Sequence, residues 1–151
     1  MQNTGKRTGM PHAAANESVL RGRWGEDVAA ERLRREGLLI IERNVRPFVH
    51  DRRLEIDIVA YDPRFDTMIF VEVKQHSSRR EGDSRLRSVN RSKKAKMRVA
   101  CNAWRRKNRW QGNYRFDVVE VYGSPGGGRA EVDHMESVNI FVPPERFALW
   151  A

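Results

Sequence analysis

Two neighbouring stretches of this chain are mostly apolar and carry charge, and the first of them alternates between apolar and other side chains. The first is residues 54–61, Leu-Glu-Ile-Asp-Ile-Val-Ala-Tyr, and the second is residues 68–74, Met-Ile-Phe-Val-Glu-Val-Lys. A period of two is typical of β-strands, and Asp62-Pro63 marks a turn between them. The short connection therefore predicts a β-hairpin with Asp57 on one strand and Glu72 on the other.

The rest of the chain predicts further helices and strands. A helical pattern covers residues 23–36, and Gly37 follows it at the position of a C-terminal cap. We expect a strand over 38–46, a long basic helix over 88–108, a fourth strand over 114–122 and an extended stretch over 132–142. The order α-β-β-β-α-β indicates an α/β fold, with a mixed β-sheet flanked by helices.

Length and composition favour a single domain outside membranes. A chain of 151 residues has room for one core, which we place in residues 18–151; residues 1–17 lack periodicity and predict a disordered tail. No apolar run approaches the roughly 20 residues of a membrane helix, and the N-terminus lacks a secretory signal. The single cysteine, Cys101, indicates a reducing cytoplasm, and four scattered histidines do not have the spacing of a zinc site.

Positive charge is concentrated in one part of the chain. The net charge is +9, and residues 76–109 contain 13 lysines and arginines against two carboxylates. Such a block indicates a polyanionic partner, since each cation that neutralises a phosphate releases counterions, although a solvated basic face that only aids solubility has the same pattern. The nucleic-acid-binding candidates are Arg91, Lys93, Lys94, Lys96 and Arg98. Trp104, Trp110 and Tyr114 flank the block and are candidates for stacking on unpaired bases, although the helical spacing of Trp104 favours a core position.

The hairpin carboxylates have the spacing of a metal site. Glu55 and Asp57 project from the same face of their strand, as do Glu72 and Lys74 on the next. If the strands pair so that these faces meet, Asp57 and Glu72 share one cation with Lys74 beside it. Phosphodiester hydrolysis needs that combination, because a hard cation polarises the phosphate and activates water. Ordinary cross-strand ion pairs on an exposed sheet face would give the same pattern.

Several motifs together resemble a known family. In chain order they are Gly25-Glu26, Arg43-Asn44, residues 55–60 (Glu-Ile-Asp-Ile-Val-Ala), residues 70–74 (Phe-Val-Glu-Val-Lys), Val89 with Lys93, and residues 115–119 (Arg-Phe-Asp-Val-Val). They look like the successive motifs of the YraN family of small bacterial proteins. That family resembles the PD-(D/E)-x-K nuclease superfamily and, distantly, archaeal Holliday junction resolvases.

The resemblance implies a restriction-endonuclease-like fold and a catalytic role for each matching residue. Asp57 and Glu72 would bind Mg²⁺ or Mn²⁺, Lys74 would orient water or stabilise charge, and Glu26 would add a carboxylate, with Glu55 as a further candidate. The chain departs from the family at Leu54, where a glycine is usual, and at residues 75–76, where Gln-His replaces Thr-Arg. Neither change removes an implied metal ligand.

Three functions remain open from the sequence. The first is a metal-dependent nuclease that cleaves DNA, more than RNA, with branched or damaged structures as substrates. The second is a nucleic-acid-binding protein of the same fold without catalysis, and the third is a scaffold for an acidic partner. Enzymes that cut two strands are often two-fold symmetric, so a homodimer is a further expectation by analogy.

Overall fold

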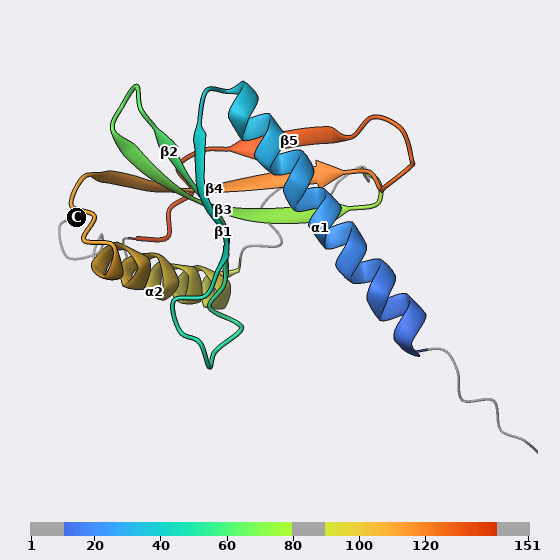
Figure 1. The fold of residues 1–151 in the computed structure, drawn as a ribbon, viewed down its shortest axis with the longest axis horizontal. Coiled ribbons are helices and arrows are strands. Elements are labelled where there is room, and N and C mark those ends of the chain that lie inside the picture. The colour runs from blue at the N-terminus through green and yellow to red at the C-terminus, as the bar shows by residue number, and fades with distance from the viewer. Residues whose placement is uncertain (1–10, 80–89, 142–151) are drawn as a thin grey trace, which may run out of the picture.

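The computed structural model describes residues 11–79 and 90–141, which form helices packed on a five-stranded sheet (Figure 1). The helices are α1 (Pro11–Arg35) and α2 (Arg91–Lys107). The strands are β1 (Leu39–Val45), β2 (Ile56–Asp62), β3 (Thr67–His76), β4 (Asn113–Tyr122) and β5 (Glu131–Met135). No helix of the described ranges is long and apolar enough to cross a membrane.

The sheet is mixed and follows the chain order β1-β2-β3-β4-β5. Only β3 and β4 run parallel, and the other neighbours are antiparallel. A parallel pair needs a long crossover, and α2 lies in that connection. The predicted α/β class, mixed sheet and order α-β-β-β-α-β are confirmed. The stretch expected over 132–142 forms β5, although the strand ends at Met135.

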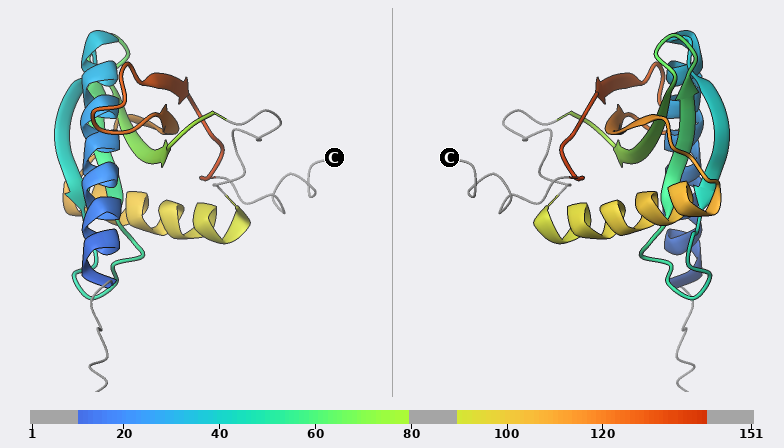
Figure 2. Two further views of the ribbon diagram at one scale, coloured as in Figure 1. Left: turned by 90° about the vertical axis from the view of Figure 1, so that its right-hand side faces the viewer. Right: turned by 90° about the vertical axis from the view of Figure 1, so that its left-hand side faces the viewer.

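The two helices cover opposite faces of the sheet (Figure 2). Met68 and Phe70 of β3 join the core cluster that contains Met97, Ala100 and Trp104 of α2. The intervening Ile69 and Val71 join the cluster that contains Ala29, Ala30 and Leu33 of α1. Alternate residues of a strand point to opposite faces, so β3 has a hydrophobic core on both sides.

Helix α1 is longer than the sequence predicted. Residues 11–17 were expected in a disordered tail, but they form the first turns of a helix that begins at Pro11. This part of the prediction was wrong, and residues 1–10 lie outside the described residues. The predicted cap is confirmed: Gly37 has φ +88°, and the Leu38 and Gly37 amides donate to Leu33 and Arg34 carbonyls, as in a Schellman motif.

Helix α2 begins at Arg91, a little later than predicted, because the Asn90 side chain caps it by accepting from the Lys93 amide at 2.9 Å. Met97, Ala100 and Trp104 face the sheet as expected. The expected partner of Lys93 at position 89 lies outside the described residues. Lys93 lies one turn before Met97 on the same side of α2. Its amine contacts Glu72 of β3.

The β2–β3 hairpin opens at the two predicted carboxylates. The last pair on that side is Ile58 with Val71, so the next two residues, Asp57 and Glu72, stand opposite each other where the ladder ends. The Asp57 carboxylate replaces a backbone acceptor there, because its Oδ2 accepts from the Val73 amide at 2.7 Å. The predicted hairpin thus brings both side chains to the same point of the sheet.

Candidate metal centre

Three carboxylates converge where β2 begins. Glu26 of α1, Glu55 and Asp57 each offer one oxygen, and these oxygens all lie within 4.8 Å of one another. Oxygen ligands at opposite sides of Mg²⁺ are about 4.2 Å apart, and those of larger cations somewhat more. The donor set therefore has the chemistry and the spacing for one hard divalent cation.

Glu26 reaches this cluster because α1 packs very closely on β3. A Cβ atom at Gly25 would lie 2.9 Å from Cβ of Gln75, closer than real contacts allow. Only glycine permits the helix to approach so far, and the next residue, Glu26, then lies beside the open end of the hairpin. This explains why Gly and Glu occur together in the motif at residues 25–26.

The end of β1 holds Glu26 from the other side. Arg43 approaches Glu26 at 3.5 Å and Asp27 at 2.8 Å. Asn44 has φ +51°, a left-handed conformation that asparagine tolerates, and its side chain acts to lower the pKa of Glu26. The Arg43-Asn44 motif therefore positions this carboxylate.

The cluster is electrostatically unbalanced at Asp57. Burial raises the pKa of Asp57 well above its usual value, and Glu72 and Glu26 raise it further. Burial and Glu55 also raise the pKa of Glu26, although Asn44 and Arg43 oppose the shift. Within the described chain Asp57 forms no ion pair, and the Val73 amide is the group that favours its charged form. A bound cation would reverse these shifts by supplying the missing positive charge.

Glu72 interacts with Asp57 but directs its charge toward two lysines. Its side chain is 8% exposed, and Oε1 lies 2.5 Å from Nζ of Lys93 and 3.1 Å from Nζ of Lys74. Burial and the neighbouring Lys74 lower the pKa of Lys93. Burial acts to lower the pKa of Lys74 too, but contact with Lys93 and Glu72 outweighs it and the pKa is raised. The two amines thus share one carboxylate oxygen in different electrostatic surroundings.

The residues predicted to contact nucleic acid differ in their exposure and in their partners. Arg98 is half-buried and donates to the Ile140 carbonyl at 2.9 Å, so it holds the segment after β5. Lys94 and Lys96 are half-buried and Arg91 is exposed on the first turns of α2. Lys93 lies against Glu72, and its expected contact with phosphate stays a prediction.

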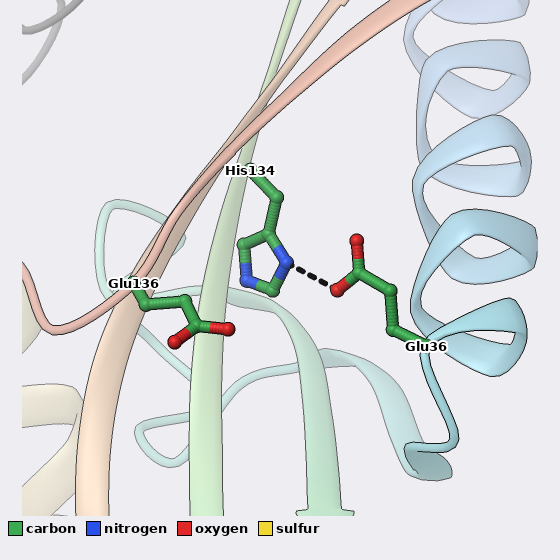
Figure 3. Close-up of side chains that lie close together, drawn as sticks. All are labelled: Glu36, His134 and Glu136. Atoms are coloured by element: carbon green, nitrogen blue, oxygen red, sulfur yellow. Dashed lines mark hydrogen bonds and ion pairs between the residues drawn. The ribbon is translucent and has the colours of Figure 1, made fainter.

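A second acidic group lies far along the sheet at Glu36, His134 and Glu136 (Figure 3). His134 Nδ1 lies 2.6 Å from Glu36, and Nε2 lies 2.7 Å from the buried Asp117. A protonated imidazole donates through both nitrogens, and although burial acts to lower the pKa of His134, Asp117 and Glu36 raise it. Both ring nitrogens are therefore occupied, and we interpret this group as a structural clamp.

Known proteins match most of this chain. Residues 25–121 match the model described as "Uncharacterised protein family UPF0102". The chain belongs to this family. UPF0102 is also known as the YraN family, so the resemblance found in the motifs is confirmed at the family level. The matched range includes Glu26, Glu55, Asp57, Glu72, Lys74 and Lys93.

Relatives from distant bacteria share the UPF0102 name. The UPF0102 protein of Syntrophotalea carbinolica is 41% identical over 116 residues, which cover 75% of this chain and 85% of that protein. One from Rhodopirellula baltica is 38% identical over 81% of this chain and 71% of its own length. One from Corynebacterium efficiens is 37% identical over 78% of this chain and 90% of its own length.

The structure brings the predicted residues together at one place in the fold, and which of them bind a metal stays a prediction. Sequence reasoning named Glu26, Asp57 and Glu72 as metal ligands, whereas the tight trio contains Glu55 in place of Glu72. The shared strand parity of Glu55 and Asp57 was the available signal. The contact of Lys93 with Glu72 had no sequence signal, because it depends on how α2 crosses the sheet.

Proposed function

We propose that this UPF0102 protein is a metal-dependent nuclease that hydrolyses phosphodiester bonds in DNA, with branched or damaged structures as substrates. One observation carries the proposal: a carboxylate trio with an uncompensated Asp57 adjoins a glutamate that holds two lysines. Metal-assisted hydrolysis uses acidic ligands that hold the cation. Amines nearby can interact with the phosphate and with the attacking water.

Glu26, Glu55 and Asp57 would hold the cation, Mg²⁺ or Mn²⁺. Glu72, which interacts with Asp57, would lie beside it. When bound, the cation supplies Lewis-acid chemistry that neutralises charge developing on the phosphate. Val73 fixes Asp57 through its amide, while Arg43 and Asn44 fix Glu26. The carboxylates are therefore oriented before substrate arrives, which is where much of the catalytic benefit of such a site originates.

Lys74 and Lys93 would have different roles in the reaction. Lys74, whose pKa is raised, keeps its charge and is suited to stabilise the oxyanion that forms on the phosphate. Lys93, whose pKa is lowered, is the group of the pair that can accept a proton from water. Glu72 keeps both amines within reach of one oxygen, so both act at the same place.

A panel of linear, flapped and four-way DNA and structured RNA, incubated with Mg²⁺ or Mn²⁺, tests the proposal. We expect cleavage of a DNA substrate, and we expect Asp57→Ala to abolish cleavage while binding persists. Asp27→Ala is the matched control, because Asp27 lies one residue from Glu26 but its side chain is 67% exposed and outside the trio. It should cleave at the wild-type rate.

The alternative function is nucleic-acid binding without catalysis. The basic block favours it as much as it favours a nuclease, since phosphate contacts need only cations. Binding to every probe with cleavage of none, in either metal, would replace the nuclease proposal by this alternative. Affinity that does not fall steeply between about 50 and 200 mM salt would contradict both functions.

A further inference from the structure

A second concave site lies at the other end of α2 from the carboxylates. The cavity has a volume of about 590 Å³, a size typical of small-molecule sites. Its lining contains three arginines, two amides and two aromatic rings, and no carboxylate: Asn102, Arg105, Arg106, Arg109, Trp110, Gln111 and Tyr114. Such a lining fits an anion that also carries a planar group.

The arginines of this cavity lack the partners that arginines have elsewhere in the fold. Arg43, Arg64 and Arg115 all face carboxylates within 3.0 Å. In contrast, no ion pair is formed by Arg105, Arg106 or Arg109 with any described residue. Three uncompensated guanidinium groups around one hollow are a site for phosphate, which arginine binds through two parallel hydrogen bonds.

Arg105 is held in place before any ligand arrives. Its guanidinium lies 3.5 Å from the centre of the Tyr114 ring, and one terminal nitrogen donates to the Asn102 side chain at 3.1 Å. Its Nε is buried and has no hydrogen-bond partner within the described chain. The stacking on Tyr114 and the hydrogen bond to Asn102 therefore fix the guanidinium beside the cavity.

The aromatic wall is equally fixed. The Trp110 indole donates to the Asn113 carbonyl at 2.9 Å and packs edge-on against Tyr61. Gly112 lies directly against the Trp110 ring, because a Cβ there would come within 2.6 Å of it. A rigid ring beside cations can stack on a base at little entropic cost.

We propose that this cavity binds one unpaired nucleotide of a nucleic-acid strand, with its phosphate on the arginines and its base against Trp110. The inference rests on the proposed function only in taking a nucleic acid as the source of the nucleotide. From Lys93 to Arg105, α2 spans about 18 Å, or about five base pairs at 3.4 Å each. The cavity thus recognises an unpaired position about half a helical turn from the carboxylates.

Arg109 offers a variant that tests the cavity without harming the fold. It occupies the C′ position after α2 with φ +51°, where glycine is favoured. Arg109→Gly should therefore keep or raise the melting temperature while removing one cation. Arg106→Gln is the second variant, and Lys107→Gln is the matched control, because Lys107 is also exposed at this end of α2 but does not line the cavity.

Binding is measured in EDTA, so that cleavage does not interfere, with a DNA hairpin that is blunt or carries a short single-stranded extension. We expect Arg109→Gly and Arg106→Gln each to bind the extended hairpin about tenfold more weakly than wild type. Lys107→Gln should change little, and the blunt hairpin should separate the variants much less. Equal losses for the variants and the control would overturn the inference, and equal losses on both hairpins would overturn the preference for an unpaired nucleotide.

NMR titrations distinguish binding of a free nucleotide from binding of a strand or of inorganic phosphate. Thymidine monophosphate should shift the NMR signals of both the Arg105 Nε–H and the Trp110 indole, and a short oligonucleotide should do so at a lower concentration. Inorganic phosphate that reproduces the whole effect would reduce the cavity to an anion site and overturn the role of Trp110. Because these measurements need no metal, a protein that binds but never cleaves would refute the nuclease and leave the cavity intact.

Discussion

Replacing Asp57 with asparagine should stabilise the metal-free protein while removing its metal response. The new amide side chain would keep an oxygen to accept from the Val73 amide and lose only the charge. Two unit charges at most 4.8 Å apart repel by at least about 3.5 kcal/mol at an effective dielectric constant of about 20. Because Arg43, Arg46 and water offset much of this, we expect a net gain of about 1–2 kcal/mol, or about 2–8 °C in melting temperature.

Thermal unfolding in EDTA and in Mn²⁺ measures both halves of this prediction. Metal at a hundred times its dissociation constant should stabilise the wild type by about 2.7 kcal/mol, and Asp57→Asn should lose most of that response. Asp27→Asn is the charge-matched control, and it should lose at most about 1 kcal/mol with the exposed ion pair to Arg43. The reasoning is refuted if Asp57→Asn melts below wild type in EDTA or keeps the full metal response.

Three further perturbations test the surroundings of the site. Gly25→Ala should push α1 away from Gln75, cost about 1–3 kcal/mol in urea unfolding and weaken Mn²⁺ binding; unchanged metal affinity would contradict the packing argument. Lys74→Met should slow cleavage at least about 100-fold, and Lys93→Met should in addition remove the ascending limb of the pH–rate profile, along which the Lys93 amine loses its proton. Identical profiles for the two variants would contradict their separate roles. Because the pKa of His134 is raised, its protonated form stabilises the fold fully below the unfolded value of 6.5, and this stability should be lost as pH rises through the folded pKa. Urea titrations across pH should show the loss in wild type and in a His50→Gln control. The loss should be missing in His134→Gln.

The two central strands of the hairpin could be predicted from the pattern of their apolar residues. Alternate residues of β3 pack on different helices, so 68–74 is a mostly apolar run, and the turn at Asp62-Pro63 separates it from the apolar run at 54–61. The start of β2 was not visible in the chain, because Leu54 donates its amide to the Asp51 carbonyl in a turn. Leu54 therefore lies in the connection, and Glu55 is presented just ahead of the first strand residue.

The N-terminal part of the first helix had no periodic signal in the sequence. Residues 14–20 are exposed along α1, and the helix extends past the sheet in Figure 1. A helix that packs against nothing over that stretch needs no apolar stripe, so the periodicity that sequence analysis depends on is missing there. Alanines at 13–15 favour helix locally, yet composition alone resembled a disordered tail.

Charge compensation distinguishes the two acidic groups of this fold. Around His134, the two carboxylates that contact its ring each face an arginine: Arg32 lies 2.7 Å from Glu36 and Arg115 lies 3.0 Å from Asp117. That group is complete, and a metal would have to displace a proton held between two carboxylates. At the hairpin, Arg43 and Arg46 reach only the outer members Glu26 and Glu55, and Asp57 stays uncompensated between them and Glu72. A fold that neutralises buried carboxylates elsewhere but leaves this one unmatched carries a destabilising charge there, and a bound cation is the simplest way to remove it.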